Sequence, residues 1–217
     1  MGCHVQVKEL FLSYRWKTFE KSIFQNLNLC IPEGTYVSIK GSNGSGKSSL
    51  IKLILGLIKP DSGEIMVNGE AVHAGYPEAV RNGKIVYMGQ QIEDLFYGET
   101  VIEELSYETE ELTPQYMQLI QDLGMESLLE RSVESLSGGE KQGLALAQLM
   151  GNSAPLIILD EPSSYLDRNN ARILRKYLKE THAAGKTILH VTQYTSELDW
   201  GTHLIDLDQS QPELKAL

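Results

Sequence analysis

The segment Gly41–Ser48, GSNGSGKS, constrains the fold of this 217-residue chain more than any other part of it. Its spacing, G-x-x-x-x-G-K-S, puts glycines where the backbone must approach an anion, so that successive N–H groups point into one concave nest. Tyr36–Ile39 before it has the pattern of a strand, and apolar residues recur at helical spacing over Ser49–Leu57 after it. A strand, a phosphate-binding loop and a helix in this order predict an α/β nucleotide-binding core.

The loop also predicts roles for its own side chains. Lys47 is expected to reach the β- and γ-phosphates of ATP, and the Ser48 hydroxyl is expected to bind Mg²⁺. The N-terminus of the following helix faces the phosphates, and its dipole favours negative charge. The predicted phosphate-binding residues are Gly41, Ser42, Asn43, Gly44, Ser45, Gly46, Lys47, Ser48 and Ser49. The alternative is an ordinary glycine turn ending in Lys-Ser, and the flanking strand and helix argue against it.

Two carboxylates stand at the end of a second apolar run. Leu156–Leu159 is continuously apolar, which suits a strand buried on both faces in a parallel sheet. Asp160 and Glu161 follow it directly, and carboxylates at such a place are costly unless they hold a cation or perform chemistry. We therefore predict Asp160 as a Mg²⁺ ligand, direct or through water. An acidic pair capping the next helix is the alternative interpretation.

A third motif, Leu136–Glu140 (LSGGE), opens a helix just upstream of these acids. Ser137 is a good N-cap, and the apolar residues after it continue with helical spacing. A serine and two glycines at a helix N-terminus make a second predicted anion site. Its members are Ser137, Gly138, Gly139 and Glu140.

Together the three motifs resemble the ATP-binding-cassette (ABC) ATPase domain, and the resemblance covers the whole length of the chain. It implies that Glu161 polarises the attacking water. It also implies that Ser137–Glu140 contacts the γ-phosphate held by a second subunit, so that two chains enclose two ATP molecules head to tail. Tyr165 replaces the small residue usual in the family's Ser164–Asp167 segment, at the expected dimer seam.

Smaller features of the same family are expected at three further places. Gln90 resembles the glutamine that senses Mg²⁺ and the water, with Gln91 as its competitor. Tyr14 resembles the aromatic residue that stacks on adenine, with Trp16 as the competing candidate and a plain edge aromatic as the simpler alternative.

The position of the family's switch histidine holds Gln193. His190 lies three positions earlier on an expected strand, Thr187–Val191, and that offset directs it to the opposite face. We predict that Gln193 keeps a hydrogen bond to the γ-phosphate with altered hydrolysis, since an amide cannot carry the proton chemistry of an imidazole. Gly143 and Gln148 also stand where the family often has arginines.

Composition and charge argue against several other classes of protein. The net charge of −10 argues against a general nucleic-acid or anionic-membrane surface. Charged or glycine residues interrupt every long apolar stretch, so no bilayer-spanning helix and no signal peptide are expected. The two cysteines, Cys3 and Cys30, lack metal-ligand spacing and predict a reducing compartment and simple packing roles.

The chain is predicted to be one ABC ATPase domain of the α/β class: a phosphate-loop core with a mostly parallel sheet, an antiparallel β layer and an inserted helical lobe. The core takes residues 1–96 and 137–217, and the lobe takes 97–136, which is rich in Glu, Leu, Gln and Met. Asn68-Gly69 marks a hairpin after a strand at Ile65–Val67. Residues after Asp208 are expected to be frayed.

The stretch 90–105 resembles the corresponding segment of cobalt-type and energy-coupling-factor importer ATPases. The resemblance implies an ATP-hydrolysing, Mg²⁺-dependent subunit of an ABC transporter, with import of a vitamin or a metal ion as the expected task. Its expected partners are a second ABC ATPase subunit, identical or not, and transmembrane permease subunits, with no nucleic acid. The expected location is cytoplasmic, on the inner face of the cell membrane. The alternatives are a catalytically weak partner in a heterodimer and an ABC ATPase without a transport role.

Overall fold

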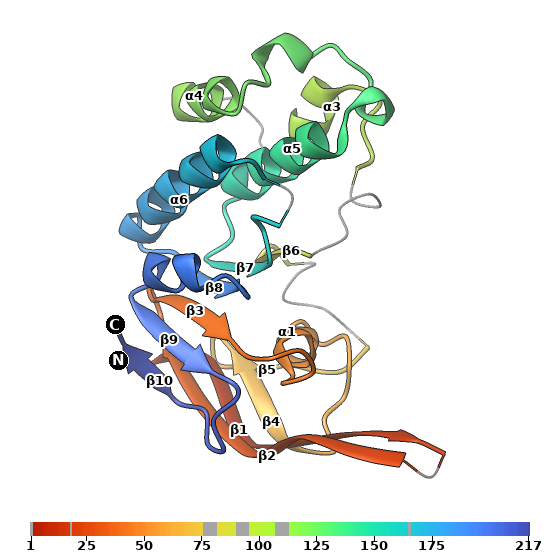
Figure 1. Cartoon of the computed structure of the whole chain (residues 1–217), viewed down its shortest axis with the longest axis vertical. Helices are drawn as coiled ribbons and strands as arrows, with labels where there is room; N and C mark the ends of the chain where they lie inside the picture. Colours follow the sequence, from red (N-terminus) through yellow and green to blue (C-terminus); the bar gives the residue numbers. More distant parts are fainter. Residues whose placement is uncertain (1, 18, 76–81, 90–95, 107–112, 165) are drawn as a thin grey trace.

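The computed structural model describes residues 2–17, 19–75, 82–89, 96–106, 113–164 and 166–217. It has two sheets with helices between and above them (Figure 1). The predicted Gln90, its competitor Gln91 and Tyr165 lie outside the described residues. Among the described helices, none combines the length and the apolar character that a bilayer crossing requires.

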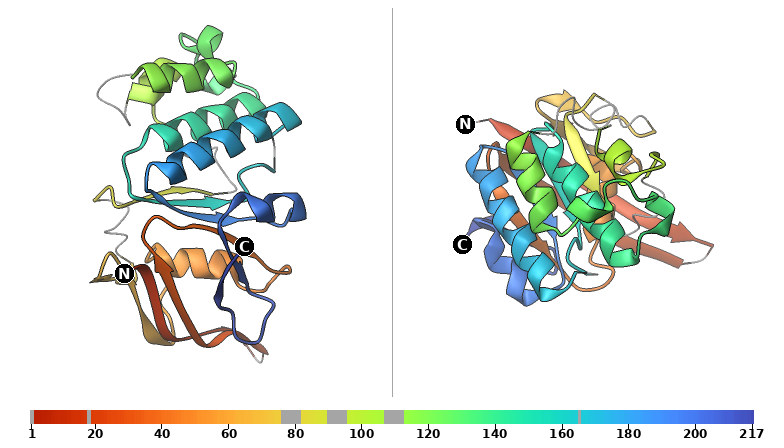
Figure 2. Two further views of the ribbon diagram at one scale, coloured as in Figure 1. Left: turned by 90° about the vertical axis from the view of Figure 1, so that its left-hand side faces the viewer. Right: turned by 90° about the horizontal axis from the view of Figure 1, so that it is seen from above.

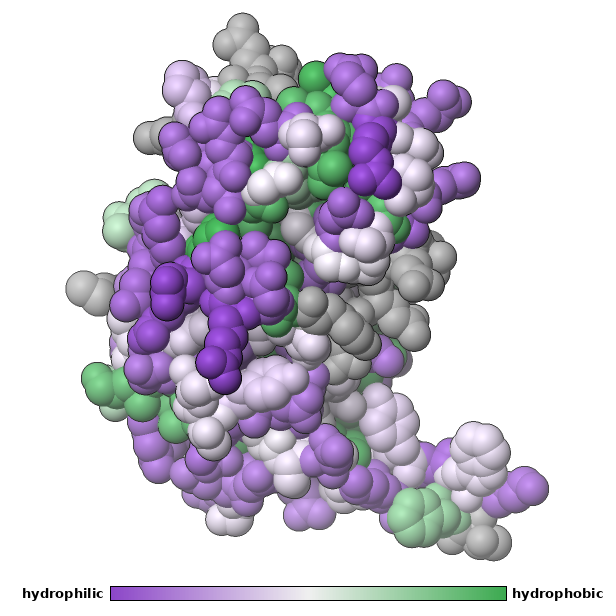
Figure 3. All heavy atoms as spheres, turned by 45° about the horizontal axis from the view of Figure 1, so that its top comes forward, coloured by the Kyte–Doolittle hydropathy of each residue, from purple (hydrophilic) through white to green (hydrophobic). Residues whose placement is uncertain are grey.

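One sheet is antiparallel and comes from the first third of the chain. Its strand order is β2-β1-β4-β5, with the bounds β1 Cys3–Trp16, β2 Phe19–Pro32, β4 Ser62–Val67 and β5 Glu70–Ala71. Alternate residues of β1 and β2 are buried, because one face of this sheet packs on the core and the other meets solvent. The Asn68-Gly69 hairpin joins β4 to β5 as predicted. The β1–β2 hairpin is long: β1 runs to Trp16 and β2 begins at Phe19, and the hairpin projects from the body of the molecule (Figure 3).

The second sheet carries the parallel core that the sequence predicts. Its order is β10-β9-β3-β8-β7-β6, with the bounds β3 Tyr36–Lys40, β6 Ile85–Met88, β7 Leu156–Asp160, β8 Thr187–Val191, β9 His203–Asp206 and β10 Leu214–Ala216. The pairs among β3, β6, β7, β8 and β9 are parallel, and β10 is antiparallel to β9. All five residues of β7 and of β8 are buried, as expected for central strands covered on both faces.

Helices cover both faces of this sheet. Helix α1, Lys47–Ile54, packs between the two sheets, and its Leu50, Ile51, Leu53 and Ile54 join their shared core. Helices α5, Gly138–Gly151, and α6, Arg168–Ala183, cover the opposite face. The left view of Figure 2 shows α5 and α6 above the sheet and α4 above them.

A separate apolar cluster forms among α3, Val101–Ser106, α4, Pro114–Asp122, and one face of α5. The short 3-10 helices η1, Glu126–Leu128, and η2, Val133–Ser135, complete this part, and η3, Thr195–Trp200, follows β8. Thr113 caps α4 by accepting a hydrogen bond from the Tyr116 N–H. Pro114 is the first residue of α4, and Gly124 follows its C-cap, Leu123.

Two expectations were wrong. The residues after Asp208 are not simply frayed, since Leu214–Ala216 adds an antiparallel edge strand to β9. The cysteines do not have independent packing roles: Cys3 and Cys30 form a disulfide. They lie on adjacent antiparallel strands with their Cα atoms 5.3 Å apart, within the distance that a disulfide spans.

Candidate functional site

The carboxyl ends of three parallel strands bring the predicted catalytic segments together. The phosphate loop follows β3, Asp160 ends β7 with Glu161 directly after it, and Gln193 follows β8. Because neighbouring parallel strands point the same way, segments that are distant in the sequence meet at one edge of the sheet. A pocket of about 330 Å³ opens there, lined by Tyr14, Lys21, Ile23, Asn43, Gly44, Gly46, Lys47, Ser48, Ser49 and Glu161.

The loop is held in a conformation that only glycine adopts easily. Gly46 is the N-cap of α1 and has a φ of 105°. A Cβ there would lie 2.6 Å from Ile23 Cγ2 and 2.7 Å from Phe24 Cζ, so side-chain-bearing residues are excluded by space as well as by backbone angle. The helix therefore begins at Lys47, two residues earlier than the sequence pattern predicts.

Lys47 is buried, and its ammonium group lies inside the curve of the loop. Its Nζ donates to the carbonyl oxygens of Gly41 and Ser42 at 2.7 and 3.1 Å. The loop backbone therefore positions the cation before any phosphate arrives, and phosphate oxygens are the stronger acceptors for it. Ser48 is exposed and Ser49 half-buried at the start of α1, and both line the pocket.

Two residues that the sequence did not indicate support the loop. Lys21 of β2 donates from its Nζ to the Gly44 carbonyl at 3.0 Å and adds a second positive charge to the pocket. Asp208 accepts hydrogen bonds from the Ser42 N–H at 2.9 Å and from the Ser42 hydroxyl at 2.7 Å. These hydrogen bonds hold the pKa of Asp208 below its usual value. Neither residue belongs to a local motif, so no sequence pattern marks them.

Tyr14 lies at the open side of the pocket. It is 46% exposed, and its hydroxyl is 3.2 Å from the Ser49 hydroxyl. Its competitor Trp16 is 75% exposed and is not among the pocket residues. This placement favours Tyr14 as the aromatic residue for a bound base.

The acidic pair has one buried and one half-buried member. Asp160 is 5% exposed, and its pKa is raised by burial and then by the neighbouring charge of Glu161, with Lys47 acting in the opposite direction. A divalent cation would relieve this unfavourable burial of negative charge, and Asp160 and Ser48 offer the hard oxygen ligands that Mg²⁺ prefers. The donor set therefore fits Mg²⁺.

Glu161 contacts the residue in the switch position. Its Oε2 accepts hydrogen bonds from Gln193 Nε2 at 2.9 Å and from the Ser164 hydroxyl at 3.2 Å. Gln193 is exposed, whereas His190 is fully buried in β8 and its Nδ1 is 3.1 Å from the Tyr36 hydroxyl. The prediction that His190 is a strand histidine on the other face is confirmed.

The signature segment forms a complete capping box at the start of α5. The Ser137 hydroxyl accepts from the Glu140 N–H at 3.3 Å, and the Glu140 carboxylate accepts from the Ser137 N–H at 2.7 Å. Ser137, Gly138 and Gly139 are exposed and are not among the residues of the phosphate-loop pocket. Figure 1 shows α5 in the upper part of the molecule and α1 in the lower part, so one chain does not bring these two anion sites together.

The neighbours of Gly143 and Gln148 explain why α5 does not need arginines at these two positions. Gln148 Nε2 donates to Glu104 Oε1 at 2.6 Å, so an amide makes the contact that a cation would make. Among the described residues, a Cβ on Gly143 would meet Met125 alone, at ordinary contact distances.

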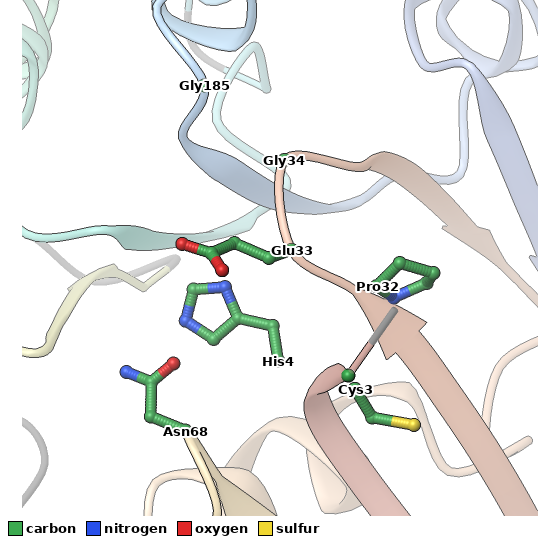
Figure 4. A pocket seen from close by; sticks show the side chains of 8 residues that line it. Cys3, His4, Pro32, Glu33, Gly34, Asn68 and Gly185 are labelled. Carbon is green, nitrogen blue, oxygen red and sulfur yellow. The ribbon is translucent and has the colours of Figure 1, made fainter.

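A larger pocket of about 610 Å³ lies at the amino ends of the parallel strands (Figure 4). The His4 ring stands between the side chains of Glu33 and Asn68, and its Nδ1 is 2.6 Å from the Thr187 hydroxyl. Burial lowers the pKa of His4. None of the predicted site residues lines this pocket.

Comparison with known proteins identifies the family. Residues 24–164 match the family model described as "ABC transporter". The energy-coupling factor transporter ATP-binding protein EcfA1 of Mycoplasma pneumoniae is 33% identical over 186 residues, which cover 82% of this chain and 68% of that protein. EcfA2 of Thermotoga maritima is 32% identical over 197 residues, covering 87% and 71%.

Solved structures agree with this assignment. The ATP-binding cassette MJ0796, a dimer in a post-hydrolysis state with ADP and phosphate bound, is 26% identical, with a TM-score of 0.77 and coverage of 93% of each chain. CbiO1 of Clostridium perfringens shares the fold, with a TM-score of 0.75, 23% identity and coverage of 95% and 85%. The chain therefore belongs to the ABC transporter family and is one of its ATP-hydrolysing cassettes.

Proposed function

We propose that this chain is the ATP-binding and ATP-hydrolysing subunit of an energy-coupling-factor-type importer of a vitamin or a metal ion. ATP binding closes a dimer of such subunits, and hydrolysis reopens it. The names of the relatives support the transporter class, and CbiO1 of Clostridium perfringens is part of the ABC transporter complex CbiONQ. The observation that carries dimer closure is the separation of the two anion sites within one chain.

The signature glycines support closure most directly. Neither Gly138 nor Gly139 has a positive φ, and a Cβ on either would meet no atom of the described residues within 4 Å. The fold of a single chain therefore does not require glycine at these positions. Close approach of another molecule does require it, and an exposed helix N-terminus with bare backbone N–H groups suits a phosphate. The γ-phosphate held by the loop of a second subunit meets this requirement.

Hydrolysis of ATP is a phosphoryl transfer to water, for which positioning and charge stabilisation matter most. Lys47 and the N–H groups of the loop bind the phosphates, and Tyr14 stacks on the adenine. Glu161 orients the attacking water and accepts its proton as the new P–O bond to the γ-phosphorus forms and the bond to the bridging oxygen breaks, releasing ADP. Ser48 and Asp160, with Gln90 from outside the described residues, would hold Mg²⁺, and the ion would supply positive charge to the phosphates.

A Glu161→Gln substitution tests this mechanism. The amide keeps the size of the side chain but cannot act as a base, so the variant should bind ATP, remain dimeric with it and lose hydrolysis. ATP turnover and light scattering with ATP measure the two effects. Hydrolysis at the parental rate would refute the role of Glu161.

The proposed location is the inner face of the cell membrane, through contacts with transmembrane permease subunits. Purification of the tagged chain from detergent-solubilised membranes, followed by identification of companion proteins, tests this. The proposal predicts a polytopic membrane protein and either one or two kinds of ATPase subunit in the complex. Recovery of the chain without any membrane protein would contradict it.

One observation favours a second candidate function, a catalytically weak subunit in a heterodimer. Gln193 donates an amide hydrogen bond to Glu161 Oε2, and this bond occupies a carboxylate oxygen that would otherwise be available to the attacking water. A Gln193→His substitution distinguishes an active ATPase subunit from a catalytically weak one. If Gln193 limits hydrolysis, the substitution should raise ATP turnover. Unchanged ATP affinity and unchanged turnover would reject a functional effect of this residue.

A further inference from the structure

A buried carboxylate lies beneath the two loops that carry Glu161 and Gln193. Glu197 belongs to η3 and is 5% exposed. Both of its oxygens are engaged: Oε1 accepts from the Ser163 hydroxyl, and Oε2 accepts from the Thr192 hydroxyl at 2.6 Å. His190 Nε2 lies 3.3 Å from the same Oε2.

These hydrogen bonds keep a negative charge inside the protein. Burial alone raises the pKa of Glu197, but the hydrogen bonds from Ser163 and Thr192 and the nearby His190 ring outweigh burial and leave the pKa below the usual value. An ionised carboxylate is an acceptor at both oxygens, so it can bind two hydroxyl groups from different segments at once. Charge-assisted hydrogen bonds of this kind are stronger than those between neutral groups.

The two hydroxyl donors flank the reactive residues in sequence. Ser163 is two residues after Glu161, and Thr192 is the residue before Gln193. The same two segments are joined at the surface by the bond from Gln193 to Glu161, and by the Glu161 N–H bonding to the Val191 carbonyl at 2.9 Å. Glu197 therefore links from below the two segments that meet in the site above.

The backbone at Glu161 needs such support. Its φ is 54°, in the left-handed region that residues other than glycine seldom adopt. A residue in this region stays there only when its surroundings hold it. The Ser163–Glu197 bond restrains the chain just after this position, and the Glu161 N–H bond to Val191 restrains it at the position itself.

We propose that Glu197 is a positioning residue for hydrolysis: by binding Ser163 and Thr192 together, it holds Glu161 and Gln193 in register with the bound γ-phosphate. It does not touch the nucleotide, because the pocket residues around the phosphate loop do not include it. The proposal rests on the proposed role of Glu161 and goes beyond it by assigning a new residue to the reaction.

The test compares Glu197→Ala and Glu197→Gln with a matched control. The Ala variant removes both acceptors and should lower kcat about tenfold or more while KM for ATP stays within about twofold, because Glu161 and Gln193 move but Lys47 and the loop that bind the nucleotide do not. The Gln variant keeps one acceptor oxygen, so its kcat should fall less than that of the Ala variant. Ser163→Ala breaks a single arm, offers a variant with little risk to folding, and should also lower kcat at constant KM.

Glu104→Gln is the control for a purely structural effect. Glu104 is also buried, at 1% exposed against 5% for Glu197, and accepts hydrogen bonds from the Tyr97 and Gly98 N–H groups and from Gln148. This variant should lower the melting temperature and leave kcat close to the parental value. A loss of kcat in the Glu104→Gln control as large as that in Glu197→Gln would overturn the proposal.

A double-mutant cycle with Glu161→Gln tests whether Glu197 acts through Glu161. In a Glu161→Gln background, Glu197→Ala should change the residual hydrolysis less than about twofold, since residues that act as a unit are not additive. If Glu197→Ala lowers kcat by the same factor in the Glu161→Gln background as in the parent protein, the proposal is refuted while the role of Glu161 stays intact. Full activity of Glu161→Gln by itself would instead refute the proposed function, so the two failures are distinguishable.

Discussion

Substitution of Gly139 by alanine separates the fold of the single chain from the function of the dimer. Gly139 is the second residue of α5, is exposed, and has open space where a Cβ would stand. Alanine is favoured over glycine by about 1 kcal/mol in a helix interior, and we expect roughly half of this in the first turn. The nucleotide-free chain should therefore gain about 0.5 kcal/mol in unfolding free energy.

For a chain of this size, that gain corresponds to a rise in melting temperature of about 1–2 °C. ATP hydrolysis should fall in the same variant, because the added methyl group would stand where the phosphate of a second subunit must approach the backbone. Thermal unfolding without nucleotide and steady-state ATPase activity measure the two effects on one sample.

Gly143→Ala is the matched control on the same helix. Gly143 is buried, and its added Cβ would meet Met125 Sδ at 3.4 Å, an ordinary contact inside the chain. This variant should be at least as stable as the parent and should keep its ATPase activity. Full activity of Gly139→Ala, or a lower melting temperature of that variant without nucleotide, would refute the reasoning.

Three further substitutions test parts of the loop and the acidic pair. Lys21→Gln should raise KM for ATP about threefold or more at unchanged kcat, because a charge is lost from the phosphate pocket; Lys8→Gln, which breaks only a surface ion pair with Glu64, is its control, and equal KM values for both variants would contradict the assignment. Gly46→Ala should cost about 2–4 kcal/mol of unfolding free energy through strain and crowding, and an unchanged urea midpoint would contradict this. Asp160→Asn should raise the melting temperature of the nucleotide-free chain at pH 7 while abolishing Mg²⁺-dependent hydrolysis. The folded pKa of Asp160 is raised, so its ionised form lowers stability above that pKa and the difference from Asn should fade as the pH falls through it; a gain that is independent of pH would rule out this explanation.

The motifs were predictable because each one contains its own structural context. The Gly41–Ser48 loop is flanked in sequence by its strand and its helix, and the apolar run before Asp160 identifies a buried strand whose end must lie at the sheet edge. Ser137 likewise indicates its helix through the capping position. The three motifs carry the resemblance to the family, and both the family and the fold class are confirmed.

The residues that support the motifs were not predictable, because their contacts join distant parts of the chain. Asp208 binds Ser42 across 166 positions, and Lys21 binds the Gly44 carbonyl from a strand of the other sheet. Only the topology places them side by side. The disulfide between Cys3 and Cys30 also depends on strand pairing, since 27 positions separate the two cysteines in sequence. The edge strand Leu214–Ala216 is short and lacks an apolar alternation long enough to mark it.

The location of the triphosphate between two chains is the claim on which the proposed function depends most. A structure of the Glu161→Gln variant determined with Mg²⁺ and ATP tests it directly. We predict a dimer in which the γ-phosphate contacts Lys47 of one chain and the Ser137–Gly139 helix start of the other. A nucleotide bound by one chain alone, with both signature segments facing solvent, would contradict the claim.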